Sequence, residues 1–155
     1  MKTVLRCGLV AAALLASGAV SAADELLTMP IDKALASPDA KSRINPNVKL
    51  LFGFNRLDGA TDPKPFKTVK RVRRPVSQVP DSAMPTDADL CATVFVQAVQ
   101  ELQQRASQEG SNAVVEIHSN WKNDETASDA TYVCAKGSAY IGVALKATVV
   151  KASGG

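Results

Sequence analysis

The sequence has few aromatic residues and no long apolar runs. Of its 155 residues, 5% are aromatic, 46% are hydrophobic and 21% are charged, and 9 Gly and 8 Pro interrupt the chain. This composition excludes a multi-span membrane protein, and the hydrophobic content excludes a wholly disordered chain. A Gly-rich loop followed by Lys and Ser or Thr is also missing from the sequence, so no ATPase motif is present. The length leaves room for one domain and little more.

The first 22 residues predict a secretory signal peptide. Lys2 and Arg6 supply a positive start, a short apolar run follows, and a small-residue cleavage site ends at Ala22. The alternative is a membrane anchor, which needs about 20 apolar residues and therefore a longer run than this one. No Cys lies just after the apolar run, so a lipoprotein is not expected. We predict a periplasmic or secreted protein with no membrane span after cleavage.

Cleavage removes Cys7 and leaves two cysteines, Cys91 and Cys134. An even pair in an exported protein predicts one disulfide bond. A reactive or metal-binding thiol pair is the alternative, but the separation is far from a Cys-x-x-Cys spacing. The bridge would stabilise the fold by about 4 kcal/mol in the chain-entropy model.

The strongest secondary-structure pattern predicts an amphipathic helix over residues 88–109. Thr86 and the acids after it suit the start of a helix, and Gly110 suits its end. Between them, apolar residues recur at spacings of three and four and form one stripe. The stripe comprises Leu90, Cys91, Val94, Phe95, Ala98, Val99, Leu102 and Ala106.

Apolar stretches elsewhere predict strands, and the whole predicts an α+β fold. The predicted strands cover residues 48–54, 66–74, 113–118, 131–136 and 139–149, with a polar loop over 119–130 and a Pro-rich loop over 75–85. The helix should pack on an antiparallel sheet of four to five strands. Residues 23–47 are predicted to be an N-terminal arm with short helical turns at 31–37 and 39–44, followed by a single domain over 48–151 and a tail over 152–155.

The predicted order of elements also indicates where the two cysteines lie relative to each other. Cys91 lies in the first turn of the predicted helix, and Cys134 lies early in the strand at 131–136. If the strand after Gly110 returns along the helix, the loop after it delivers Cys134 to the helix start. Simple connectivity therefore brings the two thiols together.

Part of the chain resembles known families. The run LQQRA at 102–106, followed by GSNAVV at 110–115, is similar to the helix–Gly-x-Asn-Ala-Val–strand core of the YbjQ-like families. Cys91, Cys134 and the run GVALK at 142–146 resemble small exported proteins that carry the label "excinuclease ATPase subunit". The layout is also similar to the sensor domain of the outer-membrane lipoprotein of the Rcs envelope-stress phosphorelay. The likeness covers roughly residues 48–151 and implies a small α+β fold, with no established chemistry.

Positive charge is concentrated in one strip, which is the chief asymmetry of the sequence. Without Lys2 and Arg6 the chain has 16 basic and 15 acidic residues, so it is nearly neutral. Six of the basic residues fall within residues 64–74, which contain no acid. Such a strand should lie at a sheet edge or face water, where its charges discourage aggregation. The strip could also attract anionic envelope material or an acidic protein partner. Nucleic acid is not expected, because aromatic residues do not interleave with the charges.

The single histidine, His118, is the one candidate for catalysis. Ser119 is a poor partner because adjacent strand residues point to opposite faces, whereas Glu116 and His118 share a face. The simplest interpretation is a solvated strand face, and the alternative is a catalytic or metal role. The acids Asp124, Glu125 and Asp129 of the next loop could add a weak metal site, although the calcium-loop spacing is absent. Trp121 in the same loop is either an exposed anchor for a partner or a lid over the sheet end.

The leading hypothesis is a non-enzymatic, exported binding or sensor-like domain without a cofactor. Its partner would be an envelope protein or an anionic envelope polymer or lipid. The predicted partner-binding residues are Lys70, Arg71, Arg73, Arg74 and Trp121. The alternatives are a small hydrolase or metal-dependent enzyme centred on His118, and a homo-oligomeric structural module. The sequence leaves the ligand and the oligomeric state open.

Overall fold

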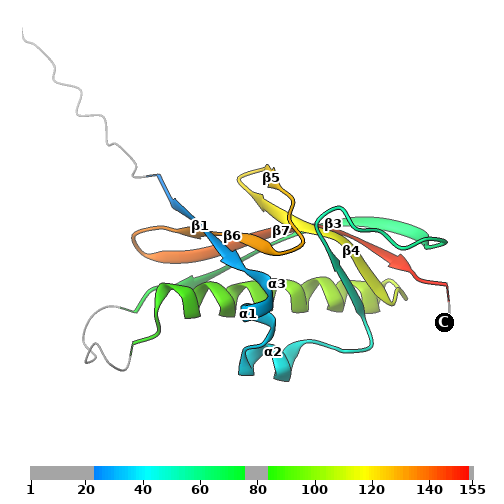
Figure 1. The fold of residues 1–155 in the computed structure, drawn as a ribbon, viewed down its shortest axis with the longest axis horizontal. Helices are drawn as coiled ribbons and strands as arrows, with labels where there is room; N and C mark the ends of the chain where they lie inside the picture. Colours follow the sequence, from blue (N-terminus) through cyan, green and yellow to red (C-terminus); the bar gives the residue numbers. More distant parts are fainter. Residues whose placement is uncertain (1–22, 76–83, 154–155) are drawn as a thin grey trace, which may run out of the picture.

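The computed structural model describes residues 23–75 and 84–153 (Figure 1). The predicted signal peptide, most of the Pro-rich loop and the last two residues lie outside the described residues. The described chain folds into one seven-stranded sheet and three helices, so the predicted α+β class is confirmed.

The N-terminal segment contributes a strand that the sequence analysis did not anticipate. Strand β1 (Glu25–Pro30) pairs antiparallel with a later strand over its whole length. The two short helices α1 (Ile31–Leu35) and α2 (Pro38–Arg43) follow where helical turns were predicted. Ala34 and Ala40 are buried, so the segment packs against the rest of the fold.

The remaining strands largely follow the predicted order. They are β2 (Lys49–Phe52), β3 (Thr61–Arg73), β4 (Ala113–Trp121), β5 (Asp124–Thr126), β6 (Thr131–Lys136) and β7 (Tyr140–Lys151). The polar loop predicted over 119–130 is wrong up to residue 126, because this part contains the end of β4 and all of β5. These two strands form a hairpin around Lys122 and Asn123, both of which have positive φ angles, as a tight hairpin turn requires.

Strand β7 lies at the centre of the sheet. β3 pairs along one edge of β7 from Lys151 to Tyr140. The other edge of β7 pairs with β4 at one end and with β6 at the other, and β2 and β1 continue the sheet outward. The sheet is therefore larger than the predicted four to five strands, and it is mixed, because one of its pairings is parallel and the others are antiparallel. β2 runs parallel to β4, because β3 and α3 form a crossover connection between them.

Helix α3 (Asp87–Gln108) lies along one face of the sheet (Figure 1). Its start is capped by Thr86, whose hydroxyl accepts a hydrogen bond from the Asp89 backbone N–H, and the Asp89 carboxylate accepts one from the Thr86 N–H. The helix buries its apolar stripe against alternate residues of β7, and both are part of the main core. The fully buried side chains of this core include Phe95, Val99, Leu102, Ile141, Val143 and Leu145.

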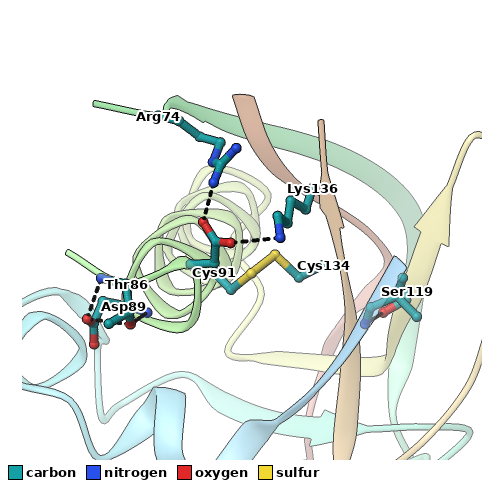
Figure 2. The surroundings of a disulfide bond; sticks show 9 residues. Arg74, Thr86, Asp89, Cys91, Ser119, Cys134 and Lys136 are labelled. Atoms are coloured by element: carbon teal, nitrogen blue, oxygen red, sulfur yellow. Dashed lines mark hydrogen bonds and ion pairs between the residues drawn. A yellow bond between two sulfur atoms is a disulfide. The ribbon is translucent and has the colours of Figure 1, made fainter. Parts of the chain in front are cut away.

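The predicted disulfide bond is confirmed. Cys91 of α3 and Cys134 of β6 are bonded, their Cα atoms lie 5.9 Å apart, and both residues are fully buried. Figure 2 shows the bridge between the first turn of the helix and the strand. Arg74 and Lys136 converge there on the carboxylate of Asp87, at 3.1 Å each.

Candidate functional site

Strand β3 divides the basic strip into two rows. Its residues 66 to 74 alternate between exposed and less exposed, because successive side chains of a strand point to opposite faces. Three basic residues on the less exposed side bind acids of α3 or of its C-cap residue Glu109, and we call them the helix-facing row. The pairs are Lys64–Glu109 at 2.6 Å, Lys70–Glu101 at 3.0 Å and Arg74–Asp87 at 3.1 Å. These charges attach the edge strand to the helix.

The other three basic residues, Lys67, Arg71 and Arg73, are exposed, and we call them the open-face row. Within residues 23–75 and 84–153, none of the three has a carboxylate within 4.0 Å. The predicted edge position of this strand is confirmed, since β3 pairs with β7 alone. The predicted binding surface needs a correction. Lys70 and Arg74 belong to the helix-facing row, and Lys67 takes their place on the open face.

Trp121 lies on the sheet face opposite α3, as the lid interpretation predicted and not as an exposed anchor. It is only 8% exposed and packs on Ala135 and Ala144. The Arg71 guanidinium lies 5.4 Å from the centroid of its ring. The indole N–H donates to the carboxylate of Asp24 at 3.3 Å. Arg71 of the open-face row and Trp121 therefore lie together on this face.

Asp24 ties the start of the described chain to this region. Its carboxylate binds the Lys122 ammonium at 2.9 Å as well as the Trp121 indole. These hydrogen bonds, the one from Lys122 above all, hold the pKa of Asp24 below its usual range. Asp24 therefore carries its negative charge at neutral pH and holds the indole in place.

Two open hollows share Trp121 and Arg71 as lining residues. The first, which we call the Tyr140 hollow, has a volume of about 290 Å³ and extends over the turn at 137–139 to Tyr140. The second, the Asn120 hollow, has a volume of about 210 Å³ and lies between β3 and the β4–β5 hairpin. The lining of the Asn120 hollow combines the basic and amide residues Lys67, Arg71, Asn120, Lys122 and Asn123 with Thr68 and the apolar residues Val69, Trp121 and Ala144.

Asn120 is a candidate that the sequence analysis missed. Its side chain is only 6% exposed, and its amide oxygen is buried with no hydrogen-bond partner among the described residues. Buried polar atoms are nearly always paired, so this oxygen is an exception in the fold. Asparagine is common in polar loops, and the sequence gives no sign that this one is buried.

His118 is buried, and the prediction of a solvated strand face at this residue is wrong. The side chain contacts the ring of Phe54, with centroids 5.8 Å apart. Its Nδ1 lies 2.6 Å from the backbone oxygen of Glu116, and its Nε2 lies 3.2 Å from a carboxylate oxygen of Glu125. Both ring nitrogens are thus occupied by neighbours of the same sheet.

The neighbours of His118 do not assemble a nucleophile or a metal site. The hydroxyl of Ser119 accepts a hydrogen bond from the backbone N–H of Val133 at 2.8 Å and is buried. Glu125 binds the Lys146 ammonium at 2.6 Å, and this hydrogen bond is the main reason its pKa is lowered. In the part of the chain that the structure describes, no three His, Cys, Asp or Glu side chains gather as metal ligands.

No protein-family model matches the chain, and no curated protein or solved structure matches it either. Among the described residues, no helix is both long enough and apolar enough to cross a membrane.

Proposed function

We propose that the chain is a non-enzymatic, exported binding domain of the cell envelope, and that its open-face row recognises a phosphate-bearing anionic component. One observation carries this proposal. Six clustered cations are divided so that three pair with acids on the helix side, while the three on the opposite face, where Arg71 lies over Trp121, have no carboxylate within 4.0 Å among the described residues. Stability alone accounts for the helix-facing row. It does not account for Lys67, Arg71 and Arg73.

Export is supported by the signal-peptide pattern of residues 1–22 and by the buried disulfide, which is typical of oxidising compartments. The intact mass of the exported protein tests both parts. We expect the mass of a chain that begins at Ala23 and lacks two hydrogens. A mass that includes Cys7, or a mass of two free thiols, would contradict this part of the proposal.

The strength of the expected interaction follows from the number of free cations. Clustered Lys and Arg near an anionic surface contribute about 1 kcal/mol each. Three such residues would therefore raise affinity by about a hundredfold. This attraction is screened at high salt, because the residues are exposed.

Two matched variants test the assignment. The open-face variant replaces Lys67, Arg71 and Arg73 with Gln, and the helix-facing variant replaces Lys64, Lys70 and Arg74 with Gln. Each removes three positive charges from β3 or the residue directly after it. Co-sedimentation with phosphatidylglycerol vesicles measures binding, and phosphatidylcholine vesicles are the reference.

The open-face variant should lose most of the vesicle binding and keep its stability. The helix-facing variant should keep the binding and lose stability, because it breaks the ion pairs with α3. Equal loss of binding in both variants would show only an effect of net charge and would reject the site. If the wild-type protein does not bind the vesicles, the proposal is wrong. If the open-face variant instead forms larger assemblies in size-exclusion chromatography, the row serves to prevent aggregation through the exposed edge of the sheet.

A further inference from the structure

We propose that the protein binds a small carboxylate with an apolar body, such as hexanoate, in a pocket on the α3 side of the sheet. We call this site the α1 pocket. Its volume is about 300 Å³, and it lies between the end of β1, α1, the first turns of α3 and β6. Among the described residues it shares no lining side chain with the two hollows of the open face, so the inference goes beyond the proposed function.

The pocket is largely apolar because small side chains meet where α1 packs against α3 (Figure 1). Ala34 of α1 and Ala88 and Ala92 of α3 line it, and their methyl groups leave space that larger side chains would fill. Met29 and Pro30, at the end of β1, complete the apolar part of the lining. Sites for small ligands are concave and mostly apolar, with a few polar groups and volumes of roughly 300–1,000 Å³. The α1 pocket is at the lower end of this range and suits only a small molecule.

Tyr132 places a hydrogen-bond donor in the wall of the pocket. Its ring stacks on Phe95 with centroids 4.0 Å apart, and the residue is only 3% exposed. Its hydroxyl has no hydrogen-bond partner among residues 23–75 and 84–153, and burial raises the pKa of the phenol. In contrast to the side-chain oxygen of Asn120, this hydroxyl is not among the unpaired polar atoms that the fold encloses completely. A ligand in the pocket can therefore reach it, and an acceptor atom there would supply the missing hydrogen bond.

Lys33 supplies a positive charge at the mouth of the pocket. It is exposed, and within the described ranges no carboxylate lies within 4.0 Å of its ammonium. Ser37 also lines the pocket, and its hydroxyl accepts from the Ala40 N–H at 3.2 Å, which leaves its own proton to donate. The lining therefore offers a cation and two hydroxyl donors. A carboxylate, which has only acceptor atoms, satisfies such a set.

Asp89 is the acid among the described lining residues, and its charge is already engaged. Its carboxylate accepts hydrogen bonds from the Thr86 N–H at 2.9 Å and from the Thr86 hydroxyl at 2.6 Å. These hydrogen bonds hold the pKa of Asp89 below its usual range, so the group is ionised at neutral pH. Lys33 favours an anion and Asp89 opposes one. The charge that the pocket prefers in a ligand is therefore the sharpest test of the proposal.

NMR titration of the wild-type protein tests the pocket with four probes. Hexanoate has the apolar body and the carboxylate, hexanol lacks the charge, hexylammonium reverses it, and butyrate shortens the body. The methyl signals of Met29, Ala34 and Ala92 report on the pocket, which these residues line. The indole signal of Trp121, on the opposite face of the sheet, reports on binding to the open-face row instead.

We expect hexanoate to shift the three methyl signals in a saturable way and to leave the Trp121 signal in place. Hexanoate should bind about tenfold more tightly than hexanol, because it adds a hydrogen bond to a charged group. Butyrate should bind about fifteenfold more weakly than hexanoate, since each buried methylene contributes about fourfold. Hexylammonium should bind most weakly of the six-carbon probes.

Two variants and a matched control assign the polar groups. Tyr132→Phe keeps the stacked ring and should lower the affinity for hexanoate about fivefold. Its stability should not fall, because the hydroxyl has no partner to lose. Lys33→Gln should reduce the preference for hexanoate over hexanol. Lys41→Gln replaces an exposed lysine of α2 that does not line the pocket, and it should change neither affinity.

Equal affinity for hexanoate and hexanol, or tighter binding of hexylammonium, would overturn the proposal. A loss of stability in Tyr132→Phe would also overturn it, because the hydroxyl would then already be hydrogen-bonded. If hexanoate shifts only the Trp121 signal, the carboxylate binds on the open face, the α1 pocket is not a site, and the proposed function stands. If hexanoate binds as expected but the vesicles do not bind, the proposed function is wrong and the α1 pocket stands.

Discussion

The guanidinium of Arg71 lies over the indole of Trp121, at 5.4 Å from the ring centroid. The indole can lie close to the sheet because Gly142, which is paired with Arg71 across β3 and β7, has no side chain. A cation over an indole contributes about 0.5–1 kcal/mol at an exposed site. The contact therefore orders the arginine for binding more than it stabilises the fold.

Gly142→Ala tests this close approach. A Cβ at Gly142 would lie 2.7 Å from Cη2 of Trp121 and 2.9 Å from Cζ3, so the indole must move. We expect a loss of about 1–3 kcal/mol in the free energy of unfolding, the usual cost of overpacking. Urea denaturation followed by far-UV circular dichroism measures it.

The double variant Gly142→Ala with Trp121→Phe is the control. Phenylalanine lacks the ring atoms that the new methyl group would meet, so Gly142→Ala should cost less in this background. An equal cost in both backgrounds would show that the indole does not set the requirement for glycine.

The two rows of β3 explain what sequence analysis can find and what it misses. The cluster of charges and the edge position were predictable from composition and spacing. The division was not, because Lys70 lies on the side that hydrophobic patterning assigns to the core. It is tolerated there since Glu101, from a helix far along the chain, neutralises it. Val69, an apolar residue next to it, is exposed instead. The alternation of apolar and polar residues along β3 is therefore misleading about which side is buried.

Local signals and long-range pairing account for the remaining successes and errors. The capped start of α3 follows from a short sequence pattern, and the disulfide bond follows from the even number of cysteines, so both were predictable. Strand β1 was not, because it is extended only through its pairing with β6, about a hundred residues later. Asn120 was missed for the same reason. Its burial depends on the way the β4–β5 hairpin closes beside β3.

Replacing both Cys91 and Cys134 with Ala should lower the free energy of unfolding by about 4 kcal/mol, because the open chain regains loop entropy when it unfolds. Urea denaturation of the oxidised protein, the reduced protein and the double variant measures the effect. The reduced protein and the variant should agree closely. A stability independent of oxidation would show that the bridge adds nothing to the packing of α3 on β6.

His118→Gln separates the proposed binding role from the enzymatic alternative. The ring fills a buried site and contacts Glu116 and Glu125, so we expect a loss of about 1–3 kcal/mol in stability. Binding to phosphatidylglycerol vesicles should stay unchanged, since His118 lines neither hollow. A hydrolytic activity of the wild type that disappears in His118→Gln, with stability unchanged, would favour the enzyme.

The helix-facing row predicts a pH dependence through Glu101. Hydrogen bonds from the Thr68 hydroxyl, and then from Lys70, hold the pKa of Glu101 below its ordinary value. A carboxylate whose pKa is lower in the folded state stabilises the fold above its unfolded pKa, and this contribution is lost as the pH falls through the folded pKa. Glu101→Gln should therefore cost about 1 kcal/mol at neutral pH, in keeping with a partly exposed ion pair.

The difference in stability between the wild type and Glu101→Gln should shrink as the pH falls through the lowered pKa of the folded carboxyl, because the wild-type side chain then becomes protonated. Denaturation at a series of pH values measures it. Thr68→Val is the matched test of the cause, because it removes the hydroxyl donor and should raise the pKa of Glu101 in an NMR titration. A stability difference that stays constant down to acid pH would show that the carboxylate is not held by β3. The helix-facing row would then have no more structural role than the open-face row, and the division on which the binding face depends would lose its physical basis.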